Sequence, residues 1–329
     1  MKIPDKRDCS PSVLIVSGRS DAEARRVAEA LGELRVPTAF LDTVLFPGSA
    51  RFSNREGRLF AGDAEQAAPE TVYLRGLATH PLLPGYHEDL VERPRGLVAQ
   101  CEEKRAFLES LLLTYERAGA RLVNTLEANR QHSRKPWQLY LLERARLPIP
   151  RRVATNDPRA ARAFVKENGP CVYKPLAGGA TVRMVTKEDL SAARLASLAL
   201  APVLFQEYCE GMSVRAYVVG GRVVAAAEIR SDEVDYRRDE QEVVPTRLSP
   251  EERRAAAAAA RACGMAFTGV DLLRGADGFR VLECNPSPMF AVFERKTGLD
   301  IAGPLARLLC RRGTRQSPAN FSPVFRGDL

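Results

Sequence analysis

Three side chains with oxygen donors stand on two short apolar runs late in the sequence. Asp271 lies on the first run, and Glu283 and Asn285 lie on the second. Glu283 and Asn285 share one face, because successive residues of a strand point to opposite faces. A three-residue loop over 276–278, with a left-handed Gly278, brings Asp271 directly opposite Glu283. The three donors then suit magnesium, which uses few protein carboxylates. The alternative interpretation is an amphipathic edge hairpin with solvated acids.

Positively charged and glycine residues that suit phosphate lie upstream of this hairpin. Lys174 ends an expected strand and is followed by Gly178 and Gly179. A lysine beside a glycine loop can hold phosphate oxygens, because glycine lets backbone N–H groups approach them. Lys135 stands at an expected helix start and could reach the same phosphates. Taken singly, each feature is more often an ordinary strand end or helix start.

Two further stretches could contact a ligand. The apolar strand that ends in Gln206 and Glu207 runs into a glycine turn. Such a strand end can offer adenine a backbone donor and acceptor in an apolar slot, although an ordinary strand terminus looks the same. The charged segment farther on carries Arg230, Arg237 and Arg238. These arginines could orient a substrate carboxylate bidentately, or they could be solvated loop residues.

The first hundred residues alternate between strand and helix patterns. Residues 12–17, 38–42 and 71–75 read as strands, and a helix to about Arg35 is expected to begin with a capping box of Ser20 and Glu23. This alternation predicts a small α/β domain. The first strand is not followed by Gly-x-Gly-x-x-Gly, which argues against a dinucleotide site there.

Two α+β regions are expected to follow. We divide the chain into an N-terminal α/β domain over 1–98, a central region over 99–203, a C-terminal region over 204–312 and a loose tail over 313–329. Helices are expected at about 99–118, 134–146, 187–199, 250–263 and 298–311, and strands at 171–174, 182–185 and 203–207, with a hairpin through Gly220-Gly221.

Composition excludes several classes of protein. The chain has 329 residues and a formal net charge of +8, but no aromatic-interleaved basic module, so we expect no nucleic-acid partner. No apolar run reaches membrane-spanning length, and the N-terminus has no apolar signal core, so a cytoplasmic protein without membrane association is expected. Seven cysteines with no metal or redox spacing argue against a disulfide framework.

In their order and spacing these features resemble the ATP-grasp superfamily over about residues 120–311. The ending formed by 269–271, 283–288 and 298–302 is most similar to the ribosomal-protein glutamate ligase branch. The stretch 40–47 resembles the graspetide (microviridin-type) synthetases, a related branch that crosslinks ribosomally made peptides. The resemblance implies a pre-ATP-grasp α/β domain followed by an ATP-grasp fold of two α+β subdomains.

The resemblance also implies roles for the residues of the central region. Lys135 and Lys174 correspond to the two lysines that hold nucleotide phosphates, and Gly178 and Gly179 to the loop that closes over them. The hinge whose backbone meets adenine corresponds to Glu207 and Cys209, with Gln206 on the strand before it. The glycine loop is shorter than the family pattern and lacks its usual serine.

In the C-terminal region the resemblance implies a metal site and a catalytic arginine. Asp271, Glu283 and Asn285 correspond to magnesium ligands, with Glu283 bridging two ions and manganese as an alternative metal. Arg215, with Lys174, is expected to act on the γ-phosphate. Ser213 stands where the family often has an acidic ribose ligand, which puts the sugar contact in doubt.

The implied reaction is carboxylate activation by ATP through an acyl phosphate, followed by attack of an amine or hydroxyl. The expected substrate is an acidic peptide or protein containing Glu or Asp, and a homo-oligomer stays open. Two alternatives remain at this point: a small-molecule kinase of ATP-grasp type, and a non-catalytic ATP-binding regulator. Trapping with hydroxylamine separates a ligase from a kinase, because only an activated acyl group forms a hydroxamate.

Overall fold

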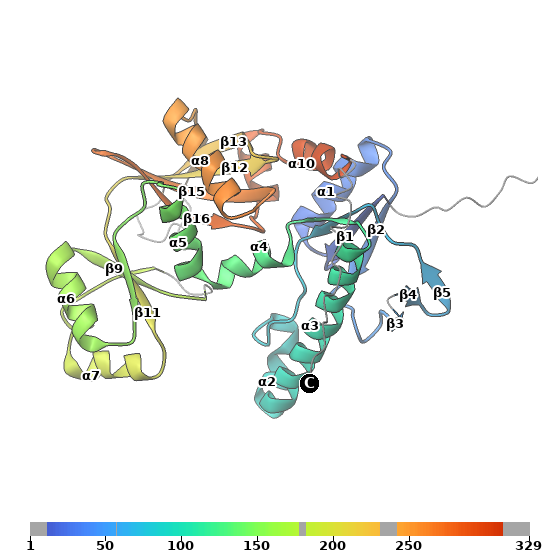
Figure 1. The fold of residues 1–329 in the computed structure, drawn as a ribbon, viewed down its shortest axis with the longest axis horizontal. Coiled ribbons are helices and arrows are strands. Elements are labelled where there is room, and N and C mark those ends of the chain that lie inside the picture. The colour runs from blue at the N-terminus through green and yellow to red at the C-terminus, as the bar shows by residue number, and fades with distance from the viewer. Residues whose placement is uncertain (1–11, 57, 178–181, 231–241, 312–329) are drawn as a thin grey trace, which may run out of the picture.

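Four β-sheets organise the residues described by the computed structural model, which are 12–56, 58–177, 182–230 and 242–311. They belong to three parts that follow one another along the chain (Figure 1). Within the described residues, no helix is both long enough and apolar enough to cross a membrane. The expected tail over 313–329 lies outside these residues.

The first part is built on a parallel sheet in the order β2-β1-β6-β7. Its central strand is buried on both faces, because α1 packs on one side and α3 on the other. A small antiparallel sheet, β3-β4-β5, extends beside it (Figure 1). The elements are β1 (Val13–Ser17), α1 (Ala22–Glu33), β2 (Thr38–Asp42), β3 (Phe52–Arg55), β4 (Arg58–Ala61), β5 (Ala64–Gln66), β6 (Thr71–Leu74), the 3-10 turn η1 (Pro84–Tyr86), α2 (His87–Glu92), α3 (Pro94–Arg117) and β7 (Arg121–Val123).

The start of α1 differs from the expected capping box. Asp21, not Ser20, is the N-cap, and its carboxylate accepts a hydrogen bond from the backbone N–H of Ala24 at 2.7 Å. Glu23 does not fold back on the cap, because its carboxylate accepts hydrogen bonds from Arg75 and from the backbone of the C-terminal part. The expected capping box is therefore wrong, and Glu23 is a long-range contact.

The second part is an antiparallel sheet in the order β10-β9-β11-β8. The helix expected over 187–199 is confirmed only in its second half, which is helical over 192–199. In the first half, Asp189 accepts two hydrogen bonds from Thr186 and closes a turn. The elements from the connection onward are α4 (Leu126–Arg130), η2 (Gln131–Ser133), α5 (Lys135–Arg144), β8 (Arg152–Thr155), α6 (Pro158–Asn168), β9 (Cys171–Pro175), β10 (Arg183–Met184), α7 (Ala192–Leu195), η3 (Ala196–Ala199) and β11 (Val203–Glu207).

The sheets divide the chain at different places from those expected. β7 pairs with β6, so the first sheet reaches residue 123 and not 98. β11 pairs with β8 and β9, so it completes the second sheet and does not open the third part at 204. The sheet boundaries differ from the expected ones because β7 adds to an edge of the first sheet, and β11 fills the gap between β8 and β9 in the second.

The third part is an antiparallel sheet in the order β14-β13-β12-β15-β16, with α8 over one face. The expected turn through Gly220 and Gly221 is present, and both glycines have positive φ, as a two-residue hairpin turn prefers. The elements are β12 (Met212–Val219), β13 (Arg222–Arg230), β14 (Glu242–Pro245), α8 (Pro250–Ala262), β15 (Phe267–Gly275), β16 (Gly278–Asn285), α9 (Ala291–Thr297) and α10 (Ala302–Leu309).

The hairpin of β15 and β16 reaches the expected pairing by a different route. Its loop has two residues, since Gly275 pairs with Gly278, so the expected three-residue loop is wrong. Farther from the loop, the register shifts between Leu272 and Asp271: Leu272 pairs with Val281, whereas Asp271 pairs with Glu283. The extra residue is Leu282, a β-bulge that restores the alignment which an even loop would have lost.

Arg274 ties this hairpin to α8, which gives a test of how the third part is stabilised. Its guanidinium donates to Glu252 at 2.6 Å and to Glu228 at 2.7 Å. Arg274→Ala leaves the Glu252 carboxylate, 7% exposed, without its cation, so we expect a loss of about 3 kcal/mol in the free energy of unfolding in urea. Arg254→Ala removes an exposed ion pair with Glu251 and should cost less than about 1 kcal/mol. Equal losses in the two variants would contradict this account.

Candidate functional site

Charged side chains form a row across three strands of the third sheet. Arg215 on β12 pairs with Asp271 on β15, and Asp271 pairs with Glu283 on β16. The guanidinium of Arg215 binds the Asp271 carboxylate through two nitrogens, one at 2.9 Å, and both side chains are about nine-tenths buried. Asn285 lies two residues beyond Glu283 on the same face. The structure therefore brings together the three expected metal ligands and the expected arginine.

Two lysines from earlier parts of the chain face the same row. Lys135, at the start of α5, donates to Glu283 at 2.5 Å, and Lys174, on β9, contributes a second positive charge. Burial by itself would raise the pKa of Glu283, but the charges of Lys135 and Lys174 hold it below the usual value. Three cations thus face two carboxylates, Asp271 and Glu283, which leaves a cluster of net positive charge suited to an anionic ligand.

The oxygen donors fit magnesium better than a metal that demands a full protein cage. Within the described residues there is no group of three His, Cys, Asp or Glu side chains with metal-binding geometry. Two carboxylates and the amide oxygen of Asn285 share one face. Magnesium commonly takes one or two carboxylates and completes its shell with water and phosphate. The residues present therefore fit a magnesium ion bound together with a nucleotide.

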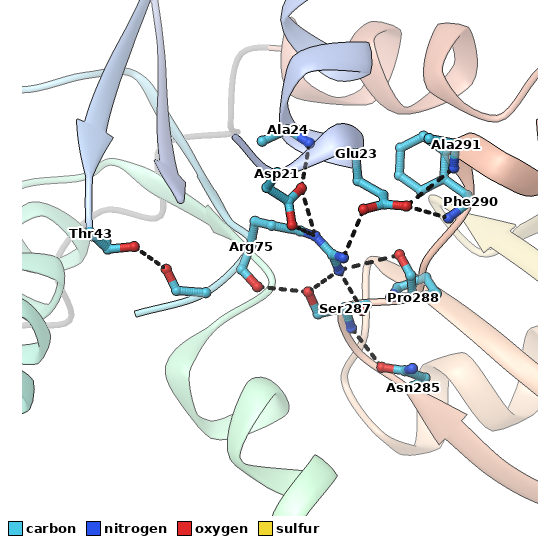
Figure 2. Close-up of polar contacts among 11 residues, drawn as sticks. Asp21, Glu23, Ala24, Thr43, Arg75, Asn285, Ser287, Pro288, Phe290 and Ala291 are labelled. Carbon is cyan, nitrogen blue, oxygen red and sulfur yellow. Dashed lines mark hydrogen bonds and ion pairs between the residues drawn. The ribbon is translucent and has the colours of Figure 1, made fainter. Parts of the chain in front are cut away.

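The amide of Asn285 is held by a contact that the sequence did not reveal. The backbone N–H of Ser287 donates to Asn285 Oδ1 at 3.0 Å. Ser287 is itself fixed by Arg75, which follows β6: Arg75 Nη1 donates to Ser287 Oγ at 2.5 Å, and Ser287 Oγ donates to Arg75 O at 2.7 Å (Figure 2). Asp21 and Glu23 bind the other nitrogens of Arg75.

Arg75 is thus a cross-link between the first sheet and the loop that follows Asn285. Its side chain is only 10% exposed although it carries a charge. Glu23 extends the link, because it also accepts hydrogen bonds from the backbone N–H groups of Phe290 and Ala291. The one signal in the sequence was the position of Arg75 at the carboxyl end of a parallel strand, where ligands and functional residues gather in open α/β sheets.

The expected adenine hinge lies at the end of β11. Gln206 is 5% exposed, and its Oε1 has no hydrogen-bond partner among the described residues. Leu204, which pairs with Lys174, lies two residues before Gln206, so the amide shares the face of Lys174. A buried amide without a partner is costly unless a ligand satisfies it. The N–H of Glu207 donates to the carbonyl of Arg151, within the sheet.

The remaining expected residues have mixed placements. Ser213 lies two residues before Arg215 on β12 and so on the same face. Cys209 lies in the hinge, where burial raises the pKa of its thiol. Arg230 ends β13 and pairs with Glu242 at 2.7 Å in an exposed ion pair, so it does not join the row. Gly178, Gly179 and Arg237 lie outside the described residues.

Glycine is required at position 269, which lies beside the row and pairs with Asn285. A Cβ at residue 269 would lie 2.9 Å from the Cβ of Pro288 and 3.2 Å from Arg215 Cδ. The missing side chain therefore lets the arginine of the row pack directly beside the loop that Arg75 holds.

Comparison with known proteins gives the family. The profile of the RimK-like ATP-grasp domain matches residues 133–309, more than half of the chain. A probable alpha-L-glutamate ligase 2 of Shewanella amazonensis is 34% identical over 183 residues, which cover 52% of this chain and 61% of that protein. The ribosomal protein bS6–L-glutamate ligase of Escherichia coli is 32% identical over 217 residues, 62% of this chain and 72% of the relative.

A solved structure matches nearly the whole chain. The ATP-grasp ligase PsnB, in a complex with a phosphomimetic variant of a minimal precursor, Mg and ADP, has a TM-score of 0.83 and 37% identity. The match covers 92% of this chain and 98% of PsnB, including the N-terminal part. The fold, the expected superfamily and both expected branches agree with these findings, and the chain belongs to the RimK-like ATP-grasp family.

Proposed function

We propose that the protein is an ATP-dependent carboxylate–amine or carboxylate–alcohol ligase that acts on a peptide or protein through an acyl phosphate. The observation that carries the proposal is the row of Arg215, Asp271 and Glu283, which Lys135 and Lys174 face. Such a cluster offers metal ligands and phosphate-binding cations within one buried patch. Relatives named as glutamate ligases, and a neighbour solved with a precursor and ADP, support the same class of reaction.

The roles of the residues follow from their charge and position. Lys135 and Lys174 offset the negative charge of the nucleotide phosphates, and Arg215 stabilises the charge that builds on the transferring phosphoryl group. Asp271, Glu283 and Asn285 are the residues that would hold magnesium, proposed as two ions. When bound, the metal neutralises phosphate charge and orients the γ-phosphate for in-line attack.

The reaction has two bond-forming steps. The substrate carboxylate attacks the γ-phosphorus of ATP, an oxygen–phosphorus bond forms, and ADP leaves with the electrons of the bond that breaks. An amine or hydroxyl then attacks the acyl carbon, and inorganic phosphate leaves with the electron pair of the carbon–oxygen bond. The nucleophile gives up its proton to solvent. No protein nucleophile is required.

We propose that adenine binds at the end of β11, where the buried amide of Gln206 is one partner and Glu207 and Cys209 form the hinge. We propose that the ribose binds near Ser213, and that Gly178 and Gly179, which lie outside the described residues, contact the phosphates. The substrate is proposed to be acidic: the formal charge of +8 favours encounter with a Glu- or Asp-rich peptide. Arg237 is proposed to contribute to that encounter, whereas the ion pair with Glu242 makes Arg230 a weaker candidate.

The first test separates a ligase from a kinase or a regulator. A short Glu-containing peptide, ATP and magnesium should give ADP, and hydroxylamine should trap a hydroxamate. Glu283→Gln should lower hydroxamate formation about 100- to 1000-fold, because it removes one charge from the metal ligands. Glu251→Gln, on the exposed side of α8, is the matched control and should retain full activity. Phosphorylation of a hydroxyl without hydroxamate would favour a kinase, and near-normal activity of Glu283→Gln would contradict the metal site.

The second test concerns the cross-link at Arg75. Lysine cannot reproduce the fork that joins Asp21, Glu23 and Ser287, so Arg75→Lys should loosen the loop that fixes Asn285. We expect the magnesium concentration for half-maximal hydroxamate formation to rise about tenfold. Arg26→Lys changes another link between the same two parts, the 2.9 Å ion pair with Glu294, and should leave that concentration unchanged. A fall in stability in Arg75→Lys without a change in the magnesium requirement would show a purely structural role.

A further inference from the structure

A pocket of about 460 Å³ lies between the first sheet and the loop after the metal ligands. It is formed where β1, β2 and β6 end, and Ser287 closes it from the C-terminal part. Thr43 donates to the carbonyl of Gly76 at 3.1 Å and so joins two of its walls (Figure 2). The carboxyl ends of parallel strands are the usual place for ligands in such sheets.

The pocket adjoins the row of charged residues. Ser287, in its wall, donates its backbone N–H to Asn285. The next residue, Pro288, packs at Gly269, where Arg215 also packs. The loop over 285–288 therefore links the wall of the pocket directly to the row.

The charges of the pocket argue against an anionic ligand. Each nitrogen of the Arg75 guanidinium already donates: Nε to Asp21, Nη2 to Glu23, and Nη1 to Ser287. Two carboxylates thus share one guanidinium, and the Asp21 side chain, in the wall, is 27% exposed. The hydroxyls of Ser17 and Ser20, which can donate or accept, lie in the same wall. The partly exposed Asp21 carboxylate attracts a hydrogen-bond donor or a cation and repels a carboxylate.

We propose that this pocket is the subsite for the attacking group of the acceptor, a side chain that ends in a hydroxyl or an ammonium. Asp21 and the two serines hold that group, and Arg75 couples it to the metal-binding loop. The inference rests on the proposed ligase function. It assigns the substrate carboxylate to the positively charged row, and the nucleophile to the pocket that contains the Asp21 carboxylate.

Gly76 allows the pocket to be filled without strain. It lines the pocket, and a Cβ at this position would meet no atom within 4 Å. Gly76→Leu is therefore chosen to add a side chain at the wall of the pocket. Gly85→Leu makes the same change at another open glycine, outside the pocket, and is the matched control.

The reaction with a Glu-containing peptide is followed in two ways: trapping by hydroxylamine, which is small, and transfer to lysinamide or threoninamide. In Gly76→Leu we expect transfer to fall at least about tenfold while hydroxamate formation stays within about twofold of wild type. Asp21→Asn keeps a good helix cap and should weaken transfer to lysinamide more than transfer to threoninamide, because it removes one negative charge. Unchanged transfer, or transfer and hydroxamate formation falling together, would overturn the proposal.

A binding experiment separates failure of this inference from failure of the ligase function. Calorimetric titration of the full chain uses three probes: Nα-acetyl-lysinamide, Nα-acetyl-threoninamide, and the Nα-acetyl amide of glutamate. Binding of either of the first two, lost in Gly76→Leu and kept in Gly85→Leu, supports the pocket even in a protein that forms no hydroxamate. Binding of the glutamate probe that is lost in Gly76→Leu and kept in Gly85→Leu, or failure of both the lysine and the threonine probes to bind the wild-type chain, would overturn it.

Discussion

One extra residue in β16 determines the geometry of the proposed active site. The two-residue loop of the hairpin would put Asp271 and Glu283 on opposite faces if the pairing continued without interruption. The bulge at Leu282 shifts the register just before Asp271, so both carboxylates reach the face of Arg215. The residues on either side of the acids, Val270 and Cys284, then remain in the core against α8. A bulge is thus what allows the same hairpin to bury an apolar face and to present charges on the other.

The row also shows how a buried acidic site can fold before its ligand binds. Two carboxylates within one patch would repel each other, but Asp271 is paired with Arg215, and Glu283 is paired with Lys135. A buried ion pair stabilises little by itself, although removing one partner is costly. The charges of Lys135 and Lys174 therefore lower the pKa of Glu283 and favour its ionised form in the free protein. Under the proposed function these carboxylates would hold magnesium, and the same cations would then be available to phosphate, so a single set of side chains would serve both states.

The sequence was sufficient for the superfamily, because the lysines, the strand-end hinge and the metal ligands follow one another in a fixed order. Their elements were also predictable, since strand alternation and the proline at the start of α8 are local signals. The loop length of the hairpin was not predictable: a bulge and a change in loop length compensate each other, and only pairing across strands reveals them. The capping box failed for a similar reason, because Glu23 has a partner, Arg75, which is distant in the sequence.

The contact between Arg75 and Ser287 joins the N-terminal part to the proposed active site. A domain that only supplied surface for a substrate could be joined to the rest by an apolar interface. Here a buried guanidinium is shared by two carboxylates at the start of α1 and by the serine that fixes Asn285. Any displacement of the first sheet relative to the third must break charged hydrogen bonds with few alternative partners, since this arginine side chain is 10% exposed. Arg75 therefore couples the position of the first sheet to that of Asn285. Under the proposed function, a substrate bound to the N-terminal part would be linked to the site of phosphoryl transfer through this one side chain.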